Sequence, residues 1–176
     1  MDLGLLSKAI GIGIAIAAPV GPVAMLCIQR SLTRGWWPGI FTGLGAATAD
    51  ALLAAISIFG LSAVLATLLD QVNWLQPACG TVLILMGIFI YLEKPATTFQ
   101  KKREFPLQNI ISSWISAFFI TILNPATIFA FLAVFVGLKI GADANHPTQE
   151  ITIVCGVFIG ASIWWLGLTT AAAKFG

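Results

Sequence analysis

The sequence has few charged side chains, and this shortage limits the class of protein that it encodes. Nine lysines and arginines and seven aspartates and glutamates make up 9% of the 176 residues, whereas hydrophobic residues make up 59%. Soluble domains are usually about 25% charged and about 45–50% apolar. A soluble fold of this length could not cover its apolar surface with so few charges. The composition therefore predicts an integral membrane protein.

Cysteine and histidine are scarce as well. Cys27, Cys79 and Cys155 are far apart, each in or beside an apolar run, and His146 is the only histidine. This spacing gives neither a disulfide framework nor a zinc site, and a buried free cysteine behaves as a small hydrophobic residue. No His/Cys/carboxylate cluster or nucleophile motif is present, and a net charge of +2 is too small to favour nucleic acid. We therefore expect no enzyme, no metal site, no cofactor and no nucleic-acid partner.

Long apolar runs recur along the chain. A helix that crosses a bilayer needs roughly 20 apolar residues, and we predict five spans, at residues about 9–28, 39–68, 75–92, 111–138 and 151–173. The second and fourth runs exceed one bilayer thickness, so these helices are expected to tilt, kink or break. A cleaved signal peptide is the alternative for the first run. Because similar runs follow it, the predicted fold class is an all-α integral membrane protein with the lipid bilayer as its partner.

Basic residues between the spans predict an orientation. Arg30 and Arg34 follow the first span without any acid, and four basic residues against two acids follow the third. Lysine and arginine favour the cytoplasmic side of a membrane. The loops at about 29–38 and 93–110 are therefore predicted to be cytoplasmic and the N-terminus to lie outside. Lys174, after the fifth span, then also falls inside.

Two of the predicted spans contain helix-breaking residues. Past the middle of the first span these residues are Pro19, Gly21 and Pro22. Near the middle of the fourth span they are Asn124 and Pro125. Irregular backbone persists in a membrane only where protein or a water-filled cavity satisfies its polar groups. Because the two spans have opposite predicted directions, the breaks point to inverted repeats with a transport site between them. Two ordinary proline kinks are the alternative.

One acid lies deep in an apolar helix. Asp50 follows Gly39 by 11 residues, which at about 1.5 Å per residue places it roughly 16 Å into the second span, near the bilayer centre. A charge there costs about 2.5–3.5 kcal/mol even on the mildest scales, and no basic residue lies at comparable depth. Asp50 is therefore expected to face a cavity, to be protonated, or both, as a proton relay or cation-binding group does. A structural hydrogen bond to a neighbouring helix is the alternative.

Small residues recur four positions apart in two of the spans. Gly39 and Gly43 lie in the second span, and Gly156 and Gly160 lie in the fifth. Small faces let membrane helices approach closely, so we predict helix contacts at these glycines. Trp165, with its neighbour Trp164, lies too deep for an interfacial belt, and it suits either a cavity wall or core packing.

Together these motifs resemble the lysine exporter (LysE/RhtB) family of amino-acid translocators. The stretch "PVGPVAMLCIQRSLTRGWWPGIFTGLGAATADALLAAISIFGL" is similar to that family's glycine–proline motif, basic turn and glycine-rich helix ending in an acid. The stretch "ITILNPATIFAFLAVF" looks like its asparagine–proline motif. The resemblance covers essentially the whole chain. It implies a secondary transporter, an antiporter of the bacterial cytoplasmic (inner) membrane, that exports amino acids or related small metabolites in exchange for a proton or cation.

The resemblance also implies where solute and ion bind. Carried over residue by residue, it gives Gly21, Pro22, Asp50, Asn124 and Pro125. The family's commoner Pro-Gly-Pro form is altered here, because Val20 stands before Gly21 and Pro19 lies one position earlier. We therefore add Pro19 to the predicted substrate- and ion-binding site, and we expect the shifted break to affect the choice of substrate.

We expect one transporter domain over residues 1–176, with a first repeat at about 1–92 and a second at about 111–176. Such proteins carry a sixth span, so the resemblance implies a 3+3 inverted repeat whose last helix lies beyond Gly176. One alternative is a heavy-metal or other cation exporter, for which only Cys27 and Asp50 offer ligands. Another is a non-transporting membrane scaffold subunit. The sequence leaves the oligomeric state open, a homo-oligomer included.

The predicted orientation can be tested by cysteine labelling from each side of the membrane. We expect the variant Thr98→Cys to react with a membrane-impermeant maleimide from the cytoplasmic side only, because the loop at about 93–110 carries a basic excess. Labelling of this position only from outside would overturn the orientation.

Overall fold

The computed structural model describes residues 3–19, 21–68, 81, 84, 85, 88, 110–137 and 147–175. These residues form six helices, and the described part of the chain contains no strand. It is therefore all-helical, as expected of a membrane protein. The predicted third span at about 75–92, apart from four isolated positions, and the predicted loop at about 93–110 lie outside the described residues.

Two helices are each long and apolar enough to cross a membrane. They are α3 (Trp36–Leu68) and α7 (Pro147–Phe175), with candidate spans at Trp36–Phe59 and Thr148–Lys174. Large apolar side chains stay exposed on the outer faces of these helices, as Ile56 and Ile163 do. Exposed apolar surface on this scale is rare in soluble monomers and suits contact with lipid. The predicted second and fifth spans thus each correspond to one continuous helix.

The predicted first and fourth spans are each divided into two helices. The first consists of α1 (Leu3–Ala17) and α2 (Pro22–Arg34), which meet at 82°, and the fourth of α5 (Ile110–Ile122) and α6 (Pro125–Gly137), which meet at 62°. Each pair passes as one apolar span when it is counted together, so the described residues hold up to four spans. Each second helix begins with a proline, whose missing N–H costs no hydrogen bond at that position. The helices therefore end where the sequence predicts breaks.

The predicted loop at about 29–38 is wrong. α2 continues to Arg34 and α3 begins at Trp36, so Gly35 alone joins the two helices. Gly35 has φ 93° and ψ 176°, a conformation that glycine adopts without steric cost. The apolar run ends near Ile28, but the polar residues that follow contain no helix breaker, so the helix continues past the end of the run.

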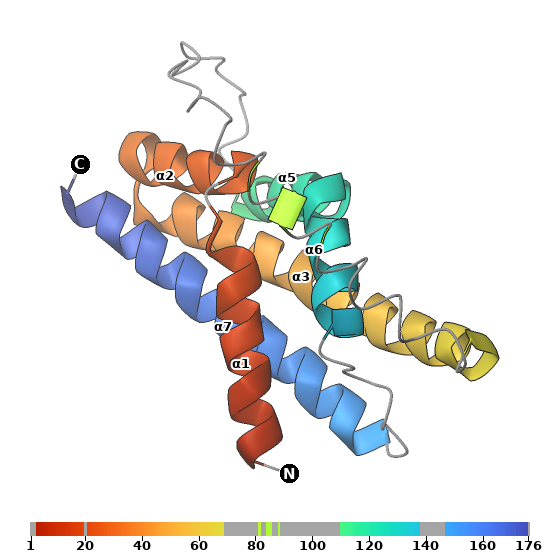
Figure 1. Cartoon of the computed structure of the whole chain (residues 1–176). Coiled ribbons are helices and arrows are strands. Elements are labelled where there is room, and N and C mark those ends of the chain that lie inside the picture. Colours follow the sequence, from red (N-terminus) through yellow and green to blue (C-terminus); the bar gives the residue numbers. More distant parts are fainter. Residues whose placement is uncertain are drawn as a thin grey trace.

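The two long helices, α3 and α7, make most of the helix contacts in the described part of the chain. α1 lies along α7, α5 lies along α3, and α3 and α7 pack against each other. Figure 1 shows α1 crossing α7 at the front of the view and α5 lying against α3. A core of buried side chains from α1, α3, α6 and α7 fills the space between them, including Ala9, Ile58, Phe131, Phe135 and Val157. The first bent pair therefore contacts both long helices, α7 through α1 and α3 through α2, whereas the second contacts mainly α3.

Glycines allow the closest of these helix contacts. A Cβ atom at Gly45 would overlap the carbonyl oxygen of Trp114 in α5, and one at Gly160 would overlap the carbonyl oxygen of Ile10 in α1. The other glycines singled out in the sequence, Gly39, Gly43 and Gly156, also lie against neighbouring side chains. The prediction of helix contacts at the small residues is therefore confirmed.

We expect Gly160→Ala to lower the free energy of unfolding by about 1–3 kcal/mol, because the added methyl group must push the α1 backbone away from α7. Gly167→Ala is the matched control, since a Cβ there meets nothing within 4 Å in the same helix. That control should be neutral or stabilising by up to about 1 kcal/mol. Thermal unfolding in detergent measures both, and equal melting temperatures would contradict the prediction.

Candidate functional site

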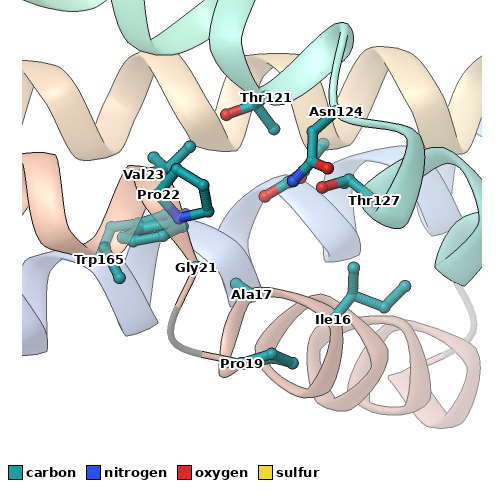
Figure 2. Close-up of a pocket in the computed structure, with 12 residues that line it drawn as sticks. Ile16, Ala17, Pro19, Gly21, Pro22, Val23, Thr121, Asn124, Thr127 and Trp165 are labelled. Carbon is teal, nitrogen blue, oxygen red and sulfur yellow. The ribbon is translucent and has the colours of Figure 1, made fainter. Parts of the chain in front are cut away.

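A cavity of about 50 Å³ lies between the two helix breaks. Its walls come from the α1–α2 break, the middle of α3, the α5–α6 break and α7. The lining residues are Ile16, Ala17, Pro19, Gly21, Pro22, Val23, Ala24, Asp50, Thr121, Asn124, Thr127 and Trp165. Figure 2 shows the polar side chains of α5, α6 and their junction across the cavity from Ile16, Ala17 and Pro19.

The cavity gathers most of the residues singled out in the sequence. Five of the six predicted site residues line it: Pro19, Gly21, Pro22, Asp50 and Asn124. The sixth, Pro125, is exposed and does not belong to the lining. The two breaks and the deep acid are thus neighbours in space although they lie on different helices. Whether these residues bind solute or ion stays a prediction.

Asp50 supplies the acidic group of the cavity. Its side chain is 3% exposed, and no basic side chain among the described residues lines the cavity with it. The indole N–H of Trp165, which lines the cavity with Asp50, has no hydrogen-bond partner within the described part of the chain. A carboxyl so enclosed needs either a proton or a cation, because burying an unpaired charge is costly.

The N-terminus of α2 opens onto the cavity. Gly21 is its N-cap and makes no side-chain capping bond, and Pro22 has no N–H to offer. The next two residues, Val23 and Ala24, line the cavity. The first N–H groups of a helix have no partner within the helix, and they form the positive end of its dipole. This end of α2 can therefore donate hydrogen bonds to an anionic group.

The second break differs from the first because it is capped. The Asn124 side-chain Oδ1 accepts a hydrogen bond from the Ala126 N–H at 3.1 Å. Asn124 thus acts as the N-cap of α6, with Pro125 in the first helical position. The carboxamide also lines the cavity. One side chain therefore both holds the break and contributes polar atoms to the site.

Two hydroxyl residues of the site were not predicted from the sequence. Thr121 and Thr127 lie three residues before and after Asn124 and line the cavity with it. The Thr121 hydroxyl is buried and has no hydrogen-bond partner among the described residues. Hydroxyl residues one helical turn on either side of a break in an apolar run are the signal that could have identified them. Trp165, for which two roles were open, both lines the cavity and packs against Gly43.

The described residues offer little to a metal ion. They contain no group of three or more His, Cys, Asp and Glu side chains placed to hold one. Cys27, the other ligand considered for a metal, does not belong to the lining of the cavity. Its thiol instead donates to the carbonyl oxygen of Gly39 at 3.4 Å.

The volume of the cavity limits the size of the solute that this conformation can hold. About 50 Å³ holds a few water molecules, whereas sites for small-molecule ligands usually measure about 300–1,000 Å³. An amino acid would need a wider space than this conformation provides. Binding of such a solute therefore requires movement of the helices around the cavity.

Comparison with known proteins gives a consistent result. The family model for LysE type translocators matches residues 14–175. The chain is 30% identical over 173 residues to a protein of Bacillus subtilis (strain 168) named "Putative amino acid efflux protein YcgF", covering 93% of this chain and 78% of that protein. It is 28% identical over 156 residues to "Uncharacterized membrane protein YahN" of Escherichia coli (strain K12), covering 86% of this chain and 67% of that protein.

No solved structure matches the chain significantly. The family match covers nearly all of the sequence, including both helix breaks and Asp50. The chain therefore belongs to the family of LysE type translocators, and it is a multi-pass membrane transporter.

Proposed function

We propose that this transporter exports amino acids or related small metabolites across the cytoplasmic membrane and couples export to proton or cation exchange. The observation that carries the proposal is the meeting of two helix breaks and a buried acid at one cavity. The name of the Bacillus relative, which refers to amino acid efflux, supports the class of solute. The basic residues near Gly35 support a cytoplasmic location for that turn, with the N-terminus outside.

The polar groups of the cavity suit a zwitterion. The Asp50 carboxylate would attract the ammonium group of an amino acid, and the free N–H groups at the start of α2, those of Val23 and Ala24, would receive its carboxylate. The Asn124 and Thr121 side chains, which also line the cavity, add neutral hydrogen-bonding groups. A solute that carries both charges therefore finds a partner for each.

A single carboxyl group can couple export to proton entry. Asp50 attracts an ammonium group when it is ionised and loses that attraction when it is protonated. Proton and solute would then compete for Asp50, so that each turn of the cycle exchanges one for the other. Competition for one site is sufficient for an antiporter that opens to one side at a time.

The packing supports an inverted repeat. α1 of the first proposed repeat packs on α7 of the second, and α5 of the second packs on α3 of the first. Two repeats that each pack their first helix on the other repeat's long helix would give this pattern. Gly45 lies where α3 contacts α5, five residues before Asp50. Gly160 lies where α7 contacts α1, five residues before Trp165. Asp50 and Trp165 would thus occupy corresponding positions at the cavity, in repeats at about 1–92 and 111–176.

We expect Asp50→Asn to insert and fold but to lose pH-driven export. The amide keeps the size of the side chain and avoids a buried charge, but it cannot exchange a proton. The measurement is transport of labelled amino acids by reconstituted vesicles after a pH jump, at matched protein levels. A variant with the wild-type rate and pH dependence would show that Asp50 is structural and that this mechanism is wrong.

We expect Asn124→Ala to impair transport at every pH, because the N-cap of α6 is lost and the shape of the break changes. Loss of such a cap costs about 1 kcal/mol, which a lower melting temperature in detergent should show. Asn124→Asp keeps an oxygen that can accept from the Ala126 N–H, so its melting temperature should stay near wild type. A melting temperature for Asn124→Ala equal to wild type would contradict the capping role.

A further inference from the structure

Arg30 forms a polar junction between three helices. Its Nη1 donates to the Thr42 hydroxyl at 2.9 Å and to the Ser113 carbonyl oxygen at 3.0 Å, and its Nη2 donates to the Ser116 hydroxyl at 2.9 Å. Thr42 belongs to α3 and both serines belong to α5, so one guanidinium bonds α2 to two other helices. From the sequence, Arg30 was expected only to mark the cytoplasmic side of the membrane. The structure instead places it, half-buried, within the helix bundle.

The acceptors around Arg30 are all uncharged. Two are hydroxyl groups and one is a backbone carbonyl, and no aspartate or glutamate of the described residues contacts the guanidinium. Hydrogen bonds from a charged donor are stronger than those between neutral groups, but weaker to neutral acceptors than to a carboxylate. The junction can therefore hold helices together and still separate during a transport cycle.

The junction around Arg30 lies about two helical turns from the cavity along α2, α3 and α5. Arg30 is eight residues from Pro22, Thr42 is eight residues from Asp50 and Ser113 is eight residues from Thr121, and these three lining residues lie on the same three helices. Ser116, further along α5, is five residues from Thr121. Eight residues of α-helix measure about 12 Å. α2, α3 and α5 thus run together from the cavity to a polar layer near the Gly35 turn.

Arg30 bonds α2 to α5 where the two helices touch least. α2 packs extensively on α3 and α7 but touches α5 over only a short stretch. α2 is also joined to α3 through Gly35 and is bonded to it by the thiol of Cys27. The surface between α2 and α5 is therefore the weakest of these contacts, and Arg30 bridges it.

We propose that Arg30 is a positioning residue for transport, which closes the cavity on the side of the Gly35 turn through Ser113 and Ser116. These bonds break when that side opens, and α5 then separates from α2. The inference rests on the proposed function, in which the cavity widens and opens to one side at a time. In the predicted orientation this side is cytoplasmic, so the junction controls the entry of the exported solute.

The test measures access to the cavity from each side. Thr121→Cys, in a background whose three native cysteines are replaced by alanine, reports on the cavity lining. Thr33→Cys, at an exposed position beside Gly35, identifies the side on which the turn lies. Both are labelled with a membrane-impermeant maleimide in right-side-out and inside-out vesicles. Arg30→Gln should speed labelling of the Thr121→Cys reporter at least five-fold from the Gly35 side and leave the rate from the other side unchanged.

Two further variants make the test specific. Ser116→Ala keeps the guanidinium and removes one acceptor, so labelling should speed at least two-fold from the same side. Gln29→Ala, at an exposed position of the same helix, is the matched control and should leave both rates unchanged. If Arg30→Gln does not reach the membrane, Ser116→Ala decides the result.

Unchanged labelling in Arg30→Gln and Ser116→Ala would overturn the proposal. An equal increase from both sides would also overturn it, since that is the result of general loosening. The labelling needs no solute, so it can succeed where amino acid transport fails. Absence of amino acid export with one-sided labelling intact would refute the proposed solute and leave the role of Arg30 standing.

Discussion

The requirement that every backbone polar group within a bilayer finds a partner underlies this structure. Prolines and glycine interrupt two apolar segments, and each interruption frees carbonyl and N–H groups that lipid cannot satisfy. The chain places both interruptions on the same interior cavity, where Asp50, Asn124 and the end of α2 surround them. The cavity is thus the place where broken backbone is tolerated, and it is also the proposed binding site for a polar solute.

The two interruptions meet that requirement in different ways. At the second, the Asn124 side chain occupies the Ala126 N–H and leaves α6 capped. At the first, Gly21 offers no side chain, and the start of α2 stays open to the cavity. The break before α6 is therefore held by its own side-chain cap, whereas the break before α2 leaves N–H groups that can donate to a bound acceptor. Under the proposed function, this difference would give the solute one preferred orientation.

The helix breaks and the deep acid could be predicted because they depend on local chemistry. Proline ends a helix wherever it stands, and an acid 11 residues into an apolar run lies deep in any packing. The continuation of α2 past Arg30 to Arg34 could not be predicted. Hydropathy shows where an apolar run ends, and a helix can continue beyond that point. The partners of Arg30 lie on α3 and α5, and Trp165 reaches the cavity from α7. Such contacts depend on how helices rotate about their axes, which a pattern along one chain does not specify.

The predicted third span, outside the described residues, stays a prediction.

Asp50 is the one acid among the described residues that line the cavity. A single carboxyl carries at most one proton in each turn of the proposed exchange. When a zwitterion, which has no net charge, leaves as that proton enters, one positive charge moves inward per cycle. The membrane voltage then drives export as well as the proton gradient does. A potential of 100 mV contributes about 2.3 kcal/mol per charge, enough to sustain a roughly 50-fold solute gradient.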